Sequence, residues 1–93
     1  MDLETAEKLS VLMMRIVAQL DQSTAYVRDH CTSKEFEAYR RVAGQVMGTI
    51  YVDIEEKLWA EHPQLRPESL GGRYRVDDDV LGPAFYRAED EGA

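Results

Sequence analysis

VAGQVMGTIYVDIEEKLW, residues 42–59, has the apolar spacing that decides the fold. The apolar residues that return every four positions are Val42, Val46, Ile50, Ile54 and Leu58. This spacing is typical of a helix with one buried stripe. Gly44 and Gly48 lie at the edge of that stripe, where each glycine costs a helix about 1 kcal/mol relative to alanine. We therefore expect another backbone to pack closely against the two glycines.

A capping box and a proline mark the ends of the helix that contains this stretch. Thr32 is followed three residues later by Glu35, a pattern in which the two residues satisfy free N–H groups at a helix start. Pro63 ends the helix because it disfavours helical geometry in the preceding residue and has no N–H to donate. The sequence therefore predicts a helix over residues 33–62.

An earlier helix is predicted over residues 3–29, with Asp2 as its N-cap. Its main apolar stripe consists of Ala6, Leu9, Leu12, Met13, Ile16, Leu20 and Val27. Only a short turn separates the two predicted helices, so they should run antiparallel to each other. The sequence predicts an all-α fold in which residues 1–62 form one long helical hairpin.

Each predicted helix also has a second apolar strip that its partner helix cannot cover. Two such helices expose more apolar surface than one hairpin can bury, so we expect self-association into a two-fold homodimer, a four-helix bundle. The predicted interface residues are Val11, Met14, Ala18, Gly44, Gly48, Tyr51, Val52 and Trp59.

Residues 63–93 have a different composition, rich in glycine and proline, and are predicted to form an irregular tail. The tail nevertheless contains several large apolar residues, including Leu65, Tyr74 and Phe85. Part of it should therefore be ordered and strapped across the helices, or should bind a partner. A frayed terminus beyond Gly72 is the alternative.

The composition bounds the class of protein and the class of partner. A chain of 93 residues is one small domain, and its net charge of −7 argues against binding to nucleic acid or to anionic membranes. The single cysteine, Cys31, cannot form a disulfide within the chain. The N-terminus MDLETAEK has neither the basic start nor the apolar run of a secretory signal. We therefore expect a cytoplasmic protein.

The sequence does not contain a recognised catalytic motif. A glycine-rich phosphate loop, a CxxC pair, HExxH and Glu-x-x-His are all absent from the 93 residues. Asp53, Glu55, Glu56 and Glu61 form an acidic cluster, but neighbours on a helix point about 100° apart, so we expect a solvated face and no acid–base pair. The prediction is a protein that is not an enzyme and has no cofactor.

A metal site is conceivable only from residues at the two ends of the predicted hairpin. His30 and Cys31 lie at the turn, whereas Glu61 and His62 lie at the far end. Only an antiparallel dimer would bring these residues together, and zinc requires a complete ligand set at fixed geometry. Ordinary surface residues are the preferred interpretation.

The run FEAYRRVAGQVMGTIYVDIEEKLWAEHPQLRPESL, residues 36–70, resembles small uncharacterised bacterial helical-hairpin proteins. It shares with them an arginine pair, a glycine-spaced helix and a closing His-Pro. The resemblance implies an all-α fold and a bacterial cytosolic setting. It implies no activity and no site residues.

The predicted function is a non-catalytic protein–protein interaction or regulatory module that acts as a homodimer. A further protein partner would bind through the tail or through the face that carries Trp59. One alternative is an acidic antidote or immunity-like protein that neutralises a basic partner through residues such as Asp77, Asp78 and Asp79. Another alternative is a helical bundle that binds a small ligand or a metal.

Overall fold

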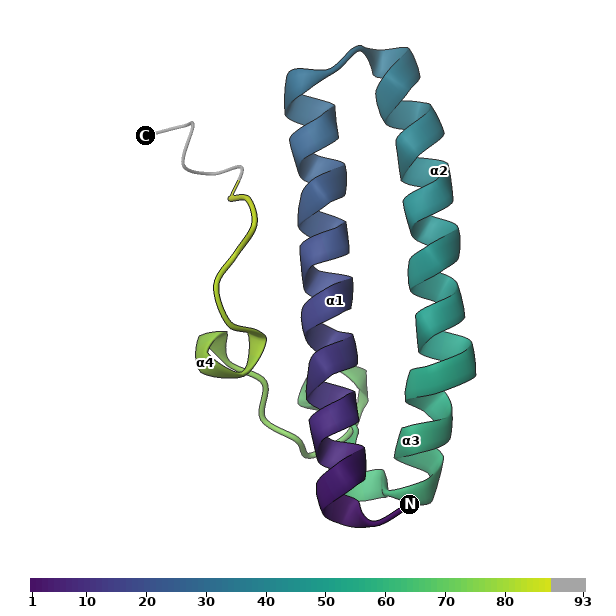
Figure 1. Cartoon of the computed structure of the whole chain (residues 1–93), viewed down its shortest axis with the longest axis vertical. Helices are drawn as coiled ribbons and strands as arrows, with labels where there is room; N and C mark the ends of the chain where they lie inside the picture. The colour runs from purple at the N-terminus through teal and green to yellow at the C-terminus, as the bar shows by residue number, and fades with distance from the viewer. Residues whose placement is uncertain (88–93) are drawn as a thin grey trace.

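The computed structural model describes residues 1–87, and the predicted all-α class is confirmed: no strand forms within this part of the chain. The elements in chain order are α1 (Leu3–His30), α2 (Ser33–Thr49), a π-helix (Ile50–Glu55), α3 (Glu56–Glu61), 3₁₀ turns at Pro63–Leu65 and Glu68–Leu70, and α4 (Asp78–Leu81). The molecule measures 44 × 28 × 21 Å. Its length comes from two helical columns that run antiparallel, with α1 beside α2 and α3 (Figure 1).

Side-chain caps fix where the two columns begin. Asp2 accepts a hydrogen bond from the Thr5 backbone N–H at 2.8 Å at the start of α1. The predicted capping box at the start of α2 is confirmed, with Thr32 Oγ1 accepting from the Glu35 N–H at 3.1 Å and Glu35 Oε1 accepting from the Thr32 N–H at 3.0 Å. The Thr32 backbone N–H, and then its hydroxyl, hold the pKa of the Glu35 carboxyl below its usual value.

The second column is not one continuous α-helix. A π-helix occupies Ile50–Glu55 between α2 and α3. Its wider turn contains one more residue than an α-helical turn, so every residue that follows is rotated by about 100° relative to an uninterrupted α-helix. The rotation explains why Glu55 and Trp59 are buried whereas Ile54 is 40% exposed.

The core lies at the open end of the two columns, away from the turn. Its buried members are Ala6, Leu58, Trp59 and Leu65, with Leu9 and Tyr74 packed against them. Trp59 is only 2% exposed, and its indole N–H donates to the Ser10 hydroxyl at 2.9 Å. Residues of α1, α3 and the segment after Pro63 thus form one small core.

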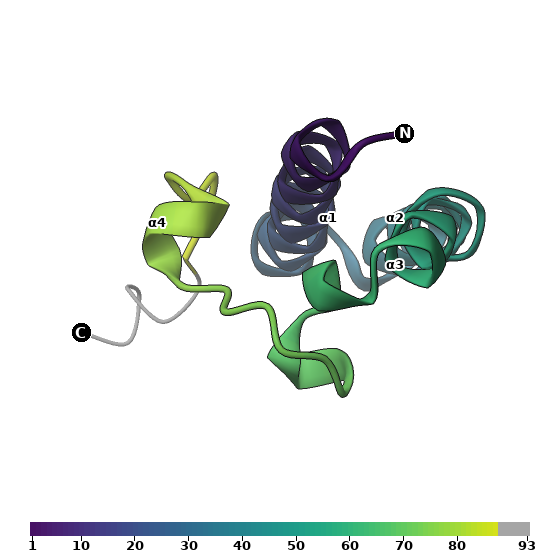
Figure 2. The same cartoon turned by 90° about the horizontal axis from the view of Figure 1, so that it is seen from below.

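Residues 63–87, here called the strap, fold back along one side of the helices. Seen along the columns, the 3₁₀ turns lie under one face of the helix pair and α4 lies beside α1 (Figure 2). Tyr74 donates to Glu7 at 2.7 Å, and Arg15 donates to the Val80 carbonyl at 2.6 Å. The opposite face of the helix pair has no such cover from these elements (Figure 2).

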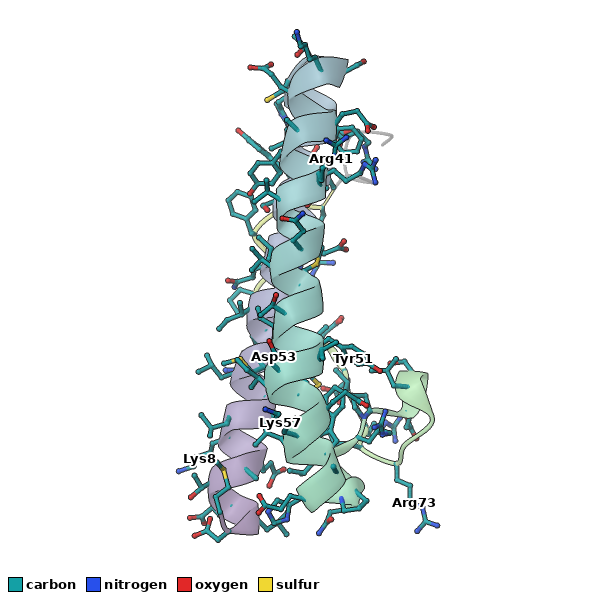
Figure 3. All side chains as sticks on the ribbon, turned by 90° about the vertical axis from the view of Figure 1, so that its right-hand side faces the viewer. Lys8, Arg41, Tyr51, Asp53, Lys57 and Arg73 are labelled. Atoms are coloured by element: carbon teal, nitrogen blue, oxygen red, sulfur yellow. The ribbon has the colours of Figure 1, made fainter. Side chains whose placement is uncertain are left out.

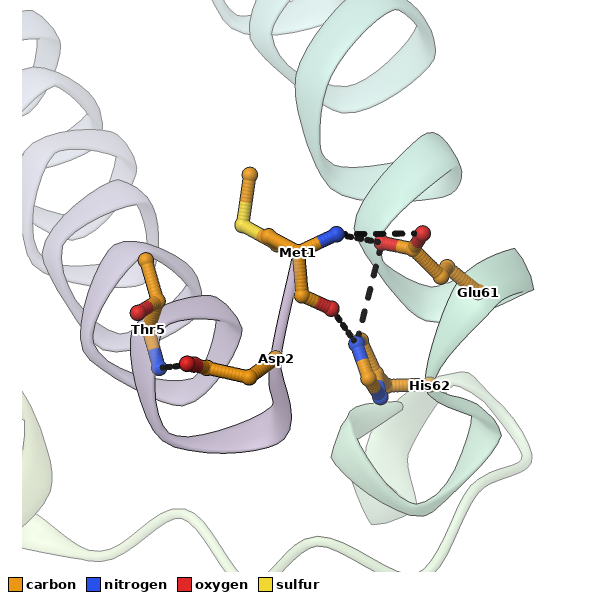
Figure 4. A network of polar contacts seen from close by, with 5 residues as sticks. All are labelled: Met1, Asp2, Thr5, Glu61 and His62. Atoms are coloured by element: carbon orange, nitrogen blue, oxygen red, sulfur yellow. Dashed lines mark hydrogen bonds and ion pairs between the residues drawn. The ribbon is translucent and has the colours of Figure 1, made fainter.

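The N-terminus closes the open end of the two columns (Figure 4). The Met1 amino group lies 3.3 Å from the Glu61 carboxylate, and His62 Nε2 lies 2.9 Å from the Met1 carbonyl oxygen. α3 ends at Glu61, directly before His62 and Pro63. These contacts tie the start of α1 to the end of α3.

Candidate functional site

The helix pair exposes large apolar side chains on the face that the strap leaves open. Ile16 of α1 and Tyr39 and Val46 of α2 line one shallow hollow of about 450 Å³ between the two helices. Leu12 and Val42 extend this row, because each lies one helical turn from a lining residue. We call these five exposed residues the open face: Leu12, Ile16, Tyr39, Val42 and Val46.

The polar groups that line the hollow are uncharged. Gln19, Leu20 and Ser23 of α1 complete the lining together with Phe85, where the strap reaches the edge of the open face. The lining contains no charged side chain among the described residues. Ser23 Oγ and the Tyr39 hydroxyl share a hydrogen bond of 2.8 Å across the two helices. An exposed apolar face with few charges is a feature of protein–protein contact sites.

The structure separates the residues predicted to form one interface. Trp59 is in the core and Met14 is also buried, so neither side chain is exposed to a partner in this chain. Ala18 is half-buried and lies with Met14 and Trp59 in a groove bordered by strap residues. The expectation that Trp59 presents a surface to another protein is therefore wrong for this conformation, because the π-helix rotates Trp59 inward.

The remaining predicted interface residues lie on other parts of the surface. Gly44 and Gly48 are exposed, and a Cβ built on either would meet nothing within 4 Å, so no described segment packs against them. Val52 is 59% exposed, whereas Val11 is half-buried on α1. Tyr51 points to the side that carries the strap and Arg73 (Figure 3). The eight residues do not form one patch, and the interface they were assigned stays a prediction.

The acidic cluster differs from the expected solvated face at one position. Asp53 is exposed on the outer side of the second column, near Lys57 (Figure 3). Glu55 is only 5% exposed. Burial raises the pKa of the Glu55 carboxyl, and the neighbouring Glu56 carboxylate raises it further. The expectation of solvation is wrong for Glu55, because the π-helix turns it toward the helix pair.

The histidines and the cysteine remain at opposite ends of the molecule. The His30 ring stacks on Tyr26 with centroids 4.2 Å apart, and its Nδ1 donates a hydrogen bond of 2.9 Å to the Tyr26 carbonyl oxygen, while Cys31 is exposed beside it. His62 contacts Met1. No group of three or more His, Cys, Asp or Glu residues suited to a metal ion occurs within residues 1–87.

The strap was the least predictable part of the site. Aromatic residues of the strap pack near the turn, where Tyr86 donates to Asp29 at 2.7 Å and lies edge-on to Tyr26. Hydrogen bonds from Arg28 and Tyr86 hold the pKa of the Asp29 carboxyl below its usual value. The apolar content of the tail indicated an ordered strap, but no spacing in it indicated which face of the helices it covers. Residues 88–93 of the predicted tail lie outside the described residues.

Comparison of the chain with protein-family models, curated proteins and solved structures found no match. The resemblance to bacterial helical-hairpin proteins therefore stays a prediction. Within residues 1–87, no helix has both the length and the apolar character needed to cross a membrane.

Proposed function

We propose that the protein is a non-catalytic interaction module that forms a homodimer through its open face. The observation that carries the proposal is the row of exposed apolar residues shared by α1 and α2 on the face opposite the strap. Each chain would contribute two antiparallel helical columns. Two copies packed face to face would form a four-helix bundle with a two-fold axis.

Three features of the surface favour a second copy as the occupant. The open face is a row of exposed apolar side chains from both helices, and the described strap residues leave it uncovered except at Phe85. The hollow is lined by side chains without charge, so two negatively charged chains can meet there without placing like charges in contact. The core lies at the open end of the helix pair, so the half near the turn has no comparable cluster of buried apolar side chains.

The role of such a dimer would be to present the strap sides of two copies outward. A protein partner would then bind the outer surfaces, where the strap carries the exposed Asp77, Asp78 and Asp79. The proposal adds no catalytic residue and no cofactor.

Sedimentation velocity over a range of concentrations tests the proposal. A species of twice the chain mass of 10.6 kDa supports it. A monomer at every concentration contradicts it and would leave the open face for a different protein.

A further inference from the structure

Glu55 is buried, but its carboxylate has no partner in the described part of the chain. The residue is 5% exposed, and none of the hydrogen bonds or ion pairs among residues 1–87 involves its side chain. Within residues 1–87, every side-chain oxygen or nitrogen that solvent cannot reach has a hydrogen-bond partner. The Glu55 oxygens therefore retain access to the groove that this residue lines.

The groove lies on the strap side of the molecule, away from the open face. It has a volume of about 350 Å³, within the range of small-molecule sites. Apolar side chains from α1, α2, α3 and the strap form most of its wall: Met14, Val17, Met47, Trp59, Leu70 and Leu81. An apolar wall with one convergent polar group suits a small amphipathic ligand.

The charges around the groove are negative. Asp21 of α1 lines the groove together with Glu55, and no Lys or Arg belongs to the lining within residues 1–87. Arg66 is close to Trp59, with its guanidinium carbon 5.5 Å from the ring centroid, but it is engaged by Glu56 at 2.7 Å. A cation from outside would therefore be the complementary group for Glu55.

We infer that the groove binds a small amphipathic amine, with its ammonium group on Glu55 and its apolar body against Met14, Met47, Trp59 and Leu81. An ammonium group would supply the hydrogen-bond donors and the positive charge that the buried carboxylate lacks. A bare metal ion fits less well, since only Glu55 and Asp21 offer ligands there. This site is separate from the proposed dimer surface, because it lies on the other side of the helix pair.

Three probes with the same apolar body separate charge recognition from simple apolar binding. Octylamine, octanol and octanoate are each titrated into the full chain, and binding is followed by the fluorescence of Trp59, the single tryptophan. Octylamine should bind about tenfold or more tightly than octanol, because charge-assisted hydrogen bonds are the stronger class. Octanoate should bind most weakly, since its carboxylate would face Glu55 and Asp21.

Two variants and one matched control assign the effect to the groove. Glu55→Gln keeps the shape and should weaken octylamine binding about tenfold while leaving octanol binding unchanged. Ala18→Leu places bulk in the groove and should weaken both probes. Asp53→Asn removes one negative charge from the exposed outer side and should leave all three affinities unchanged.

The proposal is overturned if octylamine, octanol and octanoate bind equally, if none of them binds, or if octylamine binding survives Glu55→Gln. Each variant is first compared with the parent chain by circular dichroism. A folded Glu55→Gln protein that still binds octanol ensures that a loss of octylamine binding reports the missing charge.

Discussion

The Trp59 indole N–H donates a 2.9 Å hydrogen bond to the Ser10 hydroxyl, and Ser10 and Trp59 are 1% and 2% exposed. This bond joins α3 to α1 at the centre of the small core. The guanidinium carbon of Arg66, in the strap, lies over the same indole ring, 5.5 Å from its centroid. Three segments that are distant in the sequence therefore meet at one side chain.

Ser10→Ala should destabilise the chain by about 1–3 kcal/mol, because it leaves the buried indole N–H without an acceptor. Chemical denaturation followed by Trp59 fluorescence measures the change. Ser33→Ala is the matched control, since Ser33 is exposed in the first turn of α2 and its side chain makes no hydrogen bond within residues 1–87. If the free energy of unfolding falls equally in the control variant and in Ser10→Ala, the hydrogen bond between Trp59 and Ser10 contributes no specific stability.

The two glycines of α2 should tolerate alanine. Gly44→Ala and Gly48→Ala should each raise the free energy of unfolding by up to about 1 kcal/mol, because alanine favours the helix and its Cβ meets no neighbour. Gly72→Ala is the opposite case, because its Cβ would collide with the Arg66 backbone. Thermal unfolding ranks the stabilities of the three variants against that of the parent chain. A loss of stability and of self-association in Gly44→Ala would instead place the dimer contact at the glycines, as the sequence predicted.

Glu55 should make stability depend on pH. Its pKa in the folded chain is raised by burial and by Glu56, with Asp21 also facing the groove. The neutral carboxyl therefore favours the folded state fully below the pKa of the unfolded chain, about 4.3. That contribution is lost as pH rises through the folded pKa.

Glu55→Gln removes this dependence, so the variant should gain stability relative to the parent chain as pH rises from about 4 toward neutrality. Thermal unfolding at a series of pH values measures the difference between the two proteins. Asp53→Asn, at an exposed position, should show no such growing difference. A constant offset between Glu55→Gln and the parent at all pH values would contradict the raised pKa.

The elements that local chemistry controls could be predicted from the sequence. Asp2 and Thr32 cap the two long helices, and Pro63 lies two residues after the end of α3, because capping and proline effects act within one helical turn. The positions of Glu55 and Trp59 could not be predicted, because four-residue spacing assumes an uninterrupted α-helix. A single extra residue in the π-helix rotates everything after Ile54.

The assignment of apolar strips failed for a related reason. Met14 and Ala18 were expected to bind a second copy, but the strap borders them within the chain. Ile16 and Val46 were expected to be buried between the two helices, but they remain exposed on the open face. Helical periodicity shows which face of a helix is apolar. Which segment packs against that face depends on the path of residues 63–87, which periodicity does not show.

The most direct test of self-association compares one substitution at two exposed valines of the same helical column. Val46 is 44% exposed on the open face and Val52 is 59% exposed elsewhere. Val46→Glu should convert the dimer to a monomer in sedimentation velocity, because the dimer would bury a charge without a partner. Val52→Glu should remain a dimer. A parent chain that sediments as a monomer, or a dimer that survives Val46→Glu, would contradict the account.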